Sequence, residues 1–372
     1  MKVSVLQQDL FSAVSSVSRF VSPRAQIPIL SNILFSTNKG RLNLSATNLE
    51  TGISLGISAK IFGEGKLVIP AKIITELIGN IPAGQIAIEQ KDGQVLVSCE
   101  PYFSSTITTI PVNDFPVIPT EIKDKNISLS KEVIKAITDQ VAFAAAGDET
   151  RPVLTGILLL FGETIQAVAT DGFRLSYKNI KPKTKPQVMD ADRLLIPAKS
   201  AQELVRVLGA ASEEDIGISL MKKEGQIIFS GDSVVLVGKL IEGDFPEFER
   251  VIPKKYTHRA VVDKEALVRA VKTGSVFARE AAGVVKIRIE KESLRMVAEN
   301  QQYGKGENLL DAKTEGEGVE AAFNYRYILD FLGSIEGEEV SFETEGPTSP
   351  GVFQDTKDPS YKHLIMPVRI QG

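Results

Sequence analysis

The tetrapeptide Ile69-Pro70-Ala71-Lys72 returns unchanged as Ile196-Pro197-Ala198-Lys199, 127 residues further along the chain. Two other stretches recur at nearly the same interval: Leu30-Ser31-Asn32-Ile33-Leu34 as Leu154-Thr155-Gly156-Ile157-Leu158, and Ala46-Thr47-Asn48-Leu49 as Ala169-Thr170-Asp171-Gly172. Repeats of about 20–50 residues are typical of solenoids and propellers, whereas a unit of this length can enclose its own core. The pattern therefore predicts tandem copies of one domain.

A third, weaker copy completes the 372 residues. It consists of Ala282-Gly283-Val284-Val285, Val297-Ala298-Glu299-Asn300 and Phe323-Asn324-Tyr325-Arg326. We expect three domains over residues 1–122, 127–252 and 256–372, joined by short connectors near 119–126 and 253–257.

Each copy predicts two helices and two blocks of strands. Apolar residues recur at helical spacing in six segments, 9–20, 70–81, 130–145, 197–209, 263–278 and 324–335. Pro70 suits the first turn of its helix, and Asp263 is a suitable N-cap. Alternating runs such as 41–44, 226–229 and 285–289 predict hairpin strands with one wet face. The fold class is α+β, built by triplication.

The sequence favours a soluble binding protein over an enzyme, since it has no P-loop, no dinucleotide-binding glycine motif, no HExxH motif and no Cys/His nucleophilic pair. The chain is 43% hydrophobic and 24% charged, with a net charge of −4, and no segment approaches the ~20 apolar residues of a membrane span. We therefore expect a cytoplasmic protein. Cys99 lies in an apolar alternation and is expected in the core, while His258 and His363 are expected at surfaces or interfaces. With so few histidines and cysteines, no metal or cofactor is expected.

Three further blocks resemble one family closely, the bacterial sliding clamps, which are the beta subunits of the DNA polymerase III holoenzyme. The blocks run from Ala169 to Leu175, from Gly243 to Pro253 and from Met366 to Ile370. The similarity covers the whole chain. It implies a head-to-tail homodimer closed into a ring around duplex DNA, with helices lining the hole and sheets forming the outer wall.

The geometry of such a ring can be tested with the dimensions of a helix. Six helices of ~10 Å diameter give a circumference of roughly 60 Å and a clear opening of about 9 Å. This opening is narrower than the major groove of DNA, at about 12 Å. Twelve helices widen the opening to roughly 28 Å, so a dimer fits around a duplex whereas a single chain does not.

The resemblance also implies functional residues. Arg24, Lys72 and Lys199 match positions that approach DNA, and Asp148 stands where the family has a polar loop residue. The predicted helices together hold a small positive excess of +2, which favours weak, salt-sensitive contact with phosphates. Leu77, Ile81 and Ile107 match one side of the dimer interface, and Val276 and Phe277 the other. Ser105 stands where relatives have an aromatic residue, which would soften this contact.

The family binds short peptides of its partners in one groove per chain, between the second and third domains. The implied partners are replicative and translesion polymerases, the clamp loader and mismatch-repair proteins, and the implied location is the nucleoid. The matching groove positions are Leu154, Thr170, Gly172, Phe173, Arg174, Leu175, Pro246, Arg250, Val251, Asn324, Tyr327, Ser349, Leu364, Ile365, Met366, Pro367, Val368 and Arg369. We expect apolar walls, Met366 as an adaptable filler and Arg174 and Arg250 as orienting donors.

Two departures from the family pattern and two alternative functions remain open. Phe173 replaces a histidine common in relatives, and Ala282 falls where an aromatic residue can flank the groove, so partner preference is expected to differ. A hydrolase using the Asp171-Gly172 turn lacks an accompanying base, and the duplicated Thr47-Asn48 favours a structural turn. The other alternative is a multidomain scaffold that binds proteins but no DNA.

Overall fold

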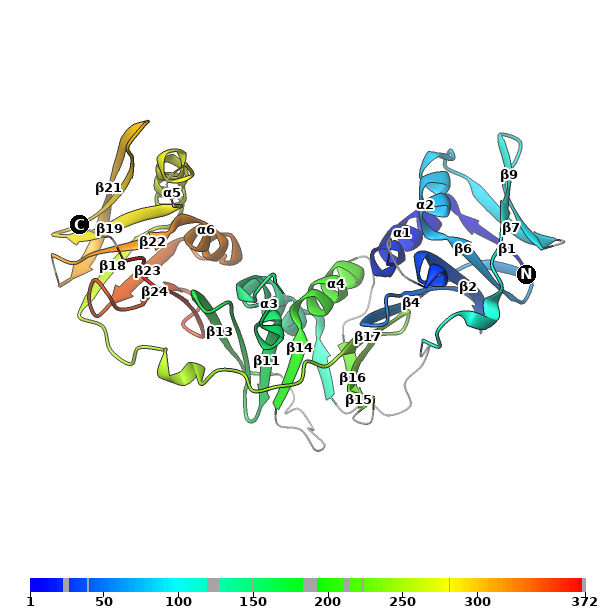
Figure 1. Cartoon of the computed structure of the whole chain (residues 1–372), viewed down its shortest axis with the longest axis horizontal. Helices are drawn as coiled ribbons and strands as arrows, with labels where there is room; N and C mark the ends of the chain where they lie inside the picture. The colour runs from blue at the N-terminus through cyan, green and yellow to red at the C-terminus, as the bar shows by residue number, and fades with distance from the viewer. Residues whose placement is uncertain are drawn as a thin grey trace. The chain divides into compact units, whose positions relative to one another are not determined.

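The computed structural model describes residues 1–22, 27–38, 40–91, 93–118, 127–148, 150–182, 193–209, 215–221, 224–280, 282–316 and 318–369 (Figure 1). They divide into two compact units. Unit 1 comprises Met1–Lys131 and Ser200–Leu240, and unit 2 comprises Glu132–Pro186, Asp190–Lys199 and Ile241–Gly372.

Unit 1 contains two antiparallel sheets. The first has the order β5-β1-β7-β8-β9, formed by Lys60–Gly63, Lys2–Leu6, Gln85–Lys91, Gln94–Cys99 and Phe103–Thr108. The second has the order β10-β15-β16-β17-β4-β3-β2-β6, formed by Ile127–Ser130, Asp215–Met221, Gln226–Ser230, Val234–Lys239, Thr51–Ser58, Arg41–Thr47, Asn32–Asn38 and Lys66–Pro70. In β1 the alternate residues Val3 and Val5 are buried on one face of the strand.

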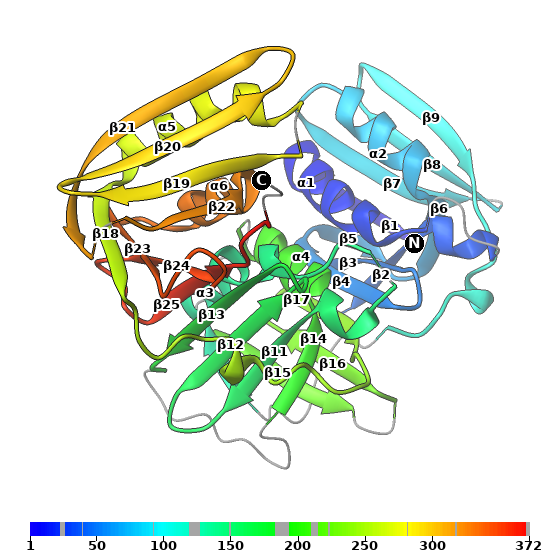
Figure 2. The ribbon, with the colours of Figure 1, turned by 60° about the vertical axis from the view of Figure 1, so that its left-hand side comes forward.

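Unit 2 is built on one long antiparallel sheet in the order β14-β11-β12-β13-β25-β24-β23-β18-β21-β20-β19-β22. Its strands are Arg193–Pro197, Gly156–Phe161, Ile165–Thr170, Arg174–Ile180, Tyr361–Ile365, Gly351–Asp355, Glu339–Thr344, His258–Asp263, Gly304–Glu315, Ser293–Asn300, Val284–Glu290 and Glu320–Asn324. In Figure 2, β19, β20 and β21 run side by side, and α5 (Lys264–Ala278) packs against them.

The two units differ from the three predicted domains because antiparallel strand pairs join neighbouring repeats. In unit 1, β17 of the second repeat pairs with β4 of the first, Val234 opposite Leu55. In unit 2, β13 of the second repeat pairs with β25 of the third, Leu175 opposite Leu364. Neighbouring repeats are thus joined by backbone hydrogen bonds. The boundaries of the two compact units therefore differ from the boundaries of the repeats. The predicted connector at 119–126 lies outside the described residues.

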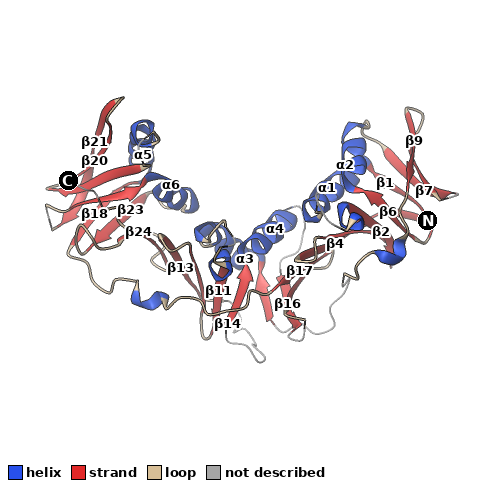
Figure 3. Ribbon diagram, viewed as in Figure 1, coloured by secondary structure: helices blue, strands red, loops and turns tan. Residues whose placement is uncertain are grey.

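All six predicted helices are present among the described residues, and Figure 3 shows helices and strands in separate colours. Besides α5, the helices are α1 (Gln7–Val17), α2 (Ala71–Asn80), α3 (Lys131–Gln140), α4 (Ala198–Gly209) and α6 (Tyr325–Ser334). Two end earlier than predicted, because short 3₁₀ turns follow α1 at Ser18–Phe20 and α3 at Ala142–Ala144. Asp263 caps α5 as predicted, its Oδ1 accepting the Ala266 N–H at 2.7 Å. Pro70 lies one position before the predicted first turn, at the N-cap of α2.

In the core of unit 2, helix α6 covers one face of the sheet. Phe331 of α6 packs against Phe353, Tyr361 and His363 of β24 and β25, with ring centroids 5.6–6.0 Å apart. Alternate residues of β25, such as Leu364, join a second apolar cluster on the opposite face. Cys99 is buried as predicted. The prediction for His363 is wrong, since its side chain is completely buried against the aromatic core.

Candidate functional site

A tight turn between β12 and β13 positions the predicted site residues. Thr170 Oγ1 accepts the Gly172 N–H at 3.0 Å and donates to the Arg174 carbonyl at 2.5 Å. Asp171 Oδ1 accepts the N–H groups of Phe173 and Arg174, at 2.8 and 3.0 Å. Gly172 has a φ of +92°, a conformation that side-chain-bearing residues rarely adopt. The threonine–aspartate–glycine sequence therefore fixes the turn locally.

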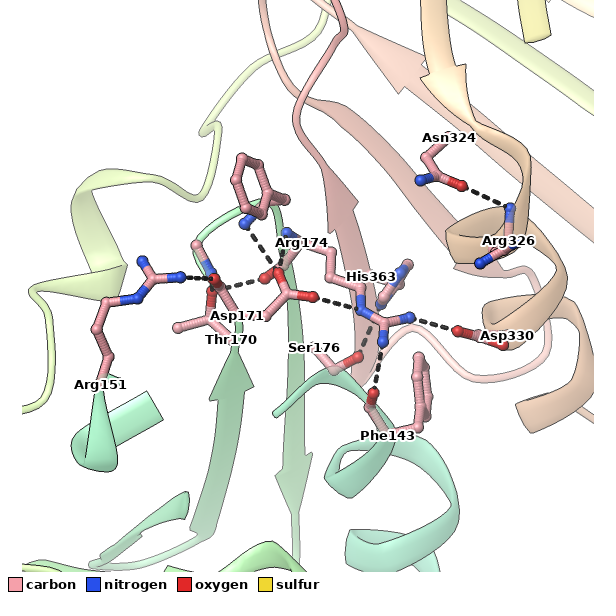
Figure 4. Close-up of polar contacts among 12 residues, drawn as sticks. Phe143, Arg151, Thr170, Asp171, Arg174, Ser176, Asn324, Arg326, Asp330 and His363 are labelled. Carbon is pink, nitrogen blue, oxygen red and sulfur yellow. Dashed lines mark hydrogen bonds and ion pairs between the residues drawn. The ribbon is translucent and has the colours of Figure 1, made fainter. Parts of the chain in front are cut away.

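Arg174 ties this turn to two other elements (Figure 4). Its Nε donates to Asp171 Oδ2 at 3.1 Å, its Nη1 pairs with Asp330 of α6, and its Nη2 donates to the Phe143 carbonyl at 2.8 Å. The guanidinium lies over the Tyr327 ring, 4.4 Å from the centroid. Burial raises the pKa of the Tyr327 phenol, helped by the nearby Asp171 carboxylate. Arg174 is thus chiefly a structural hub, and three of its five N–H groups already have partners.

These contacts make Asp171 a poor candidate for catalysis. Both of its carboxylate oxygens are engaged, one by backbone N–H groups and the other by Arg174. A Gly52-Ile53-Ser54-Leu55-Gly56 stretch matches the nucleophile pattern of hydrolases, but it lies inside strand β4, and the buried Ser54 hydroxyl bonds Ser45. That pattern requires a sharp strand-to-helix turn with an exposed serine. Neither feature supports a hydrolase.

An apolar cavity of about 250 Å³ lies beside the turn, on the sheet face opposite α6. Its lining is Arg151, Leu154, Thr170, Gly172, Arg174, Leu175, Pro246, Phe248, Val251, Leu364 and Met366. Leu154, Leu175, Phe248 and Leu364 are buried and form its floor, whereas Val251 and Met366 are partly exposed at its mouth. The cavity combines apolar walls with a few polar groups, which suits an apolar side chain of a ligand.

Nine of the predicted groove residues are brought together in this cavity. Sequence reasoning missed Arg151 and Phe248. Arg151 Nη2 donates to the Asp171 carbonyl at 3.0 Å, and its guanidinium lies beside the Cα of Gly172. Phe248 follows Phe245 in the Asp244–Arg250 run, and the two rings meet edge to face at 6.5 Å. The Phe245/Phe248 spacing was the available signal for the second of these residues.

The remaining predicted groove residues lie outside the cavity lining. Phe173 is exposed, and Met366 N–H donates to its carbonyl at 2.9 Å. Asn324 caps α6 by accepting the Arg326 N–H, and Tyr327 lies under Arg174. The prediction for Ile365 is wrong for its side chain, which is completely buried in the core on the α6 side of the sheet.

The last groove predictions concern residues at the surface. The Arg250 side chain is 82% exposed and pairs with Glu247 at 2.7 Å, so it does not reach the cavity. Ser349, Pro367, Val368 and Arg369 lie outside the cavity lining. The Val368 N–H instead bonds the Ala322 carbonyl at 2.8 Å, which anchors the C-terminal segment. Ala282, where the family can have an aromatic residue, has a φ of +38°.

The predicted DNA-facing residues that the structure describes lie at the surface. Lys72 on α2 and Lys199 on α4 are exposed and have no ion-pair partner among the described residues, and Arg24 lies outside them. Asp148 is exposed and accepts from Thr150, whose hydrogen bonds lower the pKa of its carboxyl.

Of the dimer residues, Ile81 and Ile107 are buried, Leu77 and Phe277 are half-buried, and Val276 is 64% exposed.

Family comparison decides the identity of the chain. Models of the N-terminal, central and C-terminal domains of the DNA polymerase III beta subunit match residues 1–119, 128–247 and 249–369, in that order. The chain belongs to the DNA polymerase III beta subunit family. It has three tandem clamp domains of mixed α and β structure.

Full-length relatives agree with this assignment. The chain is 29% identical to the beta sliding clamp of Caulobacter vibrioides, with all of both chains covered. It resembles the beta subunit structure from Thermotoga maritima at 27% identity and a TM-score of 0.89, again over all of both chains. A Pseudomonas aeruginosa sliding clamp bound to griselimycin is similar over all of both chains, at 26% identity and a TM-score of 0.91.

Proposed function

We infer that this chain is a sliding clamp, a non-catalytic processivity factor that encircles duplex DNA and tethers DNA polymerases. The observation that carries this function is the ordered match of all three domain families along almost the whole chain. The apolar cavity then serves as the peptide-binding groove, formed by residues of the second and third repeats. A short peptide would insert apolar side chains between Leu175, Leu364 and Met366.

Two open strand edges support closure of a ring by a second copy of the chain. Among the described residues, β9 in unit 1 pairs only with β8. In unit 2, the first part of β21, 304–311, pairs only with β20. Exposed edges of this kind are templates for another chain. Head-to-tail pairing of β9 in one chain with β21 in the other would bring Ile107 near Val276 and Phe277. In each chain, the proposed domains extend over 1–122, 127–252 and 256–372.

The charges of the helices fit weak contact with DNA. Helix α5 carries +2, α4 +1 and α1 −1, while the other three are neutral, so the helices sum to +2 in a chain of net −4. Few phosphate contacts give low, salt-sensitive affinity. Weak contact suits a ring held on DNA by topology, with Arg24, Lys72 and Lys199 near the duplex.

The finer partners follow from the same groove. Replicative and translesion polymerases, the clamp loader and mismatch-repair proteins would compete for one cavity per chain, in the cytoplasm and at the nucleoid. None of the described helices is long and apolar enough to cross a lipid bilayer.

Topological retention tests the function. The chain is loaded on a nicked circular duplex with the clamp loader of the same genome, and half of the sample is then linearised. A sliding clamp stays with the circle during gel filtration at high salt and is lost from the linear form. Equal loss from both forms, or equal retention, would refute the clamp and favour a scaffold or an ordinary DNA-binding protein.

A further inference from the structure

A second cavity, of about 180 Å³, lies on unit 2 outside the groove described above. The segment from Pro253 to Tyr256 forms one wall. Strands β23, β24 and β25, which are neighbours in the sheet (Figure 2), form the other wall. Its lining is Pro253, Lys254, Lys255, Tyr256, Glu343, Thr344, Val352 and Lys362. Nothing in the proposed function uses these residues.

The second cavity continues the groove along two elements. Val251 lines the groove, and Pro253 lines the second cavity two residues later. On β25, Leu364 lines the groove and Lys362 the second cavity, and both point to the same sheet face because they are two residues apart. Val352 of the second cavity is the cross-strand partner of Leu364. The step along β25 is about 7 Å, which two residues of an extended peptide cover.

The lining of the second cavity is basic. Lys254, Lys255 and Lys362 have no ion-pair partner among the described residues. The one lining carboxylate, Glu343, is already paired with Arg259 at 3.2 Å. Burial raises the pKa of Glu343, while the charges of Arg259 and Lys362 oppose that shift. Three lysines against one carboxylate leave this cavity with an excess of two positive charges.

The face on which the lysines lie argues against DNA as their ligand. Tyr361, His363 and Ile365 alternate with Lys362 along β25 and are buried in the core beneath α6. Lys362 therefore points to the face opposite that helix. In the proposed ring, helices line the hole, so a ligand on this face is a protein. Carboxylates of a partner peptide complement the lysines.

We propose that the cavity of Lys254, Lys255 and Lys362 is an accessory subsite for an acidic residue, placed about two or three positions from the apolar anchors of a partner peptide. The proposal rests on the proposed function, since it extends the peptide groove. Exposed ion pairs contribute modestly to affinity and are screened by salt. The subsite thus adjusts partner ranking while the apolar groove supplies the basic affinity.

Fluorescence polarisation with matched synthetic peptides tests the subsite. Each labelled peptide has a Leu-Phe anchor, with either Glu-Glu or Gln-Gln placed two residues before or after it. At low salt, we expect one acidic placement to bind about three- to ten-fold tighter than its neutral twin. The Lys254→Gln/Lys362→Gln variant should lose that preference while binding the neutral peptide as before. Lys291→Gln, on an exposed turn, is the matched control and should keep it.

The outcomes separate the subsite from the groove. If the neutral peptides bind but no acidic placement gains, the subsite is refuted and the groove stands. If no peptide binds and Met366→Ala changes nothing, the groove itself is refuted. Were the lysine variant to lose affinity for a duplex oligonucleotide and keep its peptide preference, the lysines would contact DNA and the subsite would be wrong.

Discussion

Arg174 joins the turn of the candidate site to α6 through two ion pairs. Its side chain is 11% exposed, and it pairs with Asp171 and Asp330 while stacking on Tyr327. The family resemblance implies an orienting donor for the peptide at this position. In the structure this guanidinium joins the β12–β13 turn to α6 through Asp171 and Asp330, and it also lines the cavity.

Replacing Arg174 should therefore cost stability as well as binding. Arg174→Ala leaves the Asp171 carboxylate and the Phe143 carbonyl without this partner. We expect a loss of about 2–4 kcal/mol in the free energy of unfolding, below the range for fully buried pairs because Asp330 is partly exposed. Urea denaturation measures the loss. Arg250→Ala, at an 82% exposed ion pair, is the control and should change stability by under about 0.5 kcal/mol. Equal effects of the two variants would contradict the structural role.

His363 is the second informative residue, because it is a buried histidine with an incomplete set of hydrogen bonds. Its Nδ1 lies 2.7 Å from Ser176 Oγ, and its Nε2 has no partner among the described residues. Burial, reinforced by the nearby Arg174 charge, lowers the pKa of the imidazole to about 3. The ring therefore stays neutral in the folded protein at physiological pH.

Acid should destabilise the fold partly through His363. The unfolded chain takes up a proton near pH 6.5, whereas the folded chain does so only near pH 3. Stability is thus independent of this group above about pH 6.5 and falls as the pH drops below it, by about 2 kcal/mol between pH 7 and pH 5. His363→Phe with Ser176→Ala removes both hydrogen-bonding partners and should lose this component. Denaturation midpoints at pH 7 and pH 5 check it, and an unchanged pH slope in the double variant would contradict it.

At the scale of elements, the groove turn recurs in the other repeats. At the end of β20 in the third repeat, Asn300 Oδ1 accepts the N–H groups of Gln302 and Tyr303, at 2.8 and 3.1 Å. In unit 1, Thr47 Oγ1 accepts the Leu49 N–H at 3.0 Å, and Asn48 Oδ1 accepts from Glu50 and Thr51. These contacts repeat those of Thr170 and Asp171 in unit 2. The two turns differ at the residue with positive φ, where Leu49 has φ +75° and Gly172 has φ +92°. Leu49 is 54% exposed and puts a side chain where unit 2 leaves room for the Arg151 guanidinium.

Substitutions at Gly172 and Leu49 should separate the effect of backbone strain on stability from the effect of the turn on peptide binding. At Gly172, a Cβ would approach Arg151 Nη1 to 3.1 Å. Gly172→Ala is therefore expected to cost about 1 kcal/mol of stability and to weaken peptide binding several-fold. Leu49→Gly should instead gain about 0.5–1 kcal/mol by relieving the left-handed conformation, without changing peptide affinity. Urea denaturation and peptide titration of both variants check this. Full peptide affinity in Gly172→Ala would show that the turn can shift without closing the groove.

The elements also show how far sequence reasoning reaches. Helical spacing and hairpin turns predict all six helices and strands such as β3, β16 and β19, because these signals are local. The recurring Thr-Asn and Thr-Asp turns are local as well. Burial of His363 and the contact of Arg151 with the Asp171 carbonyl depend on residues brought from distant strands. No spacing in the chain encodes such contacts.

At the scale of the whole molecule, the repeats predict three domains, but the pairs β17–β4 and β13–β25 distribute them over two compact units. In both pairs, strands of neighbouring repeats join in one sheet. Towards the two ends of the chain, β9 and the 304–311 part of β21 each have one side unpaired among the described residues. Open edges of this kind can pair with another chain, which fits the proposed ring of two copies.

A single charged residue should then prevent assembly. Val276 is 64% exposed near the end of α5, and Phe277 beside it packs on Gly306 of β21. Light scattering of the native chain should give about twice 40.4 kDa at micromolar concentration. Val276→Asp would bury a carboxylate at the predicted interface, which costs several kcal/mol and should leave mostly monomer. Val117→Asp, at a 97% exposed valine, is the matched control and should stay dimeric. A native monomer, or a Val276→Asp dimer as tight as the control, would place the interface elsewhere, because an apolar contact made by both chains of a ring cannot absorb an unpaired charge.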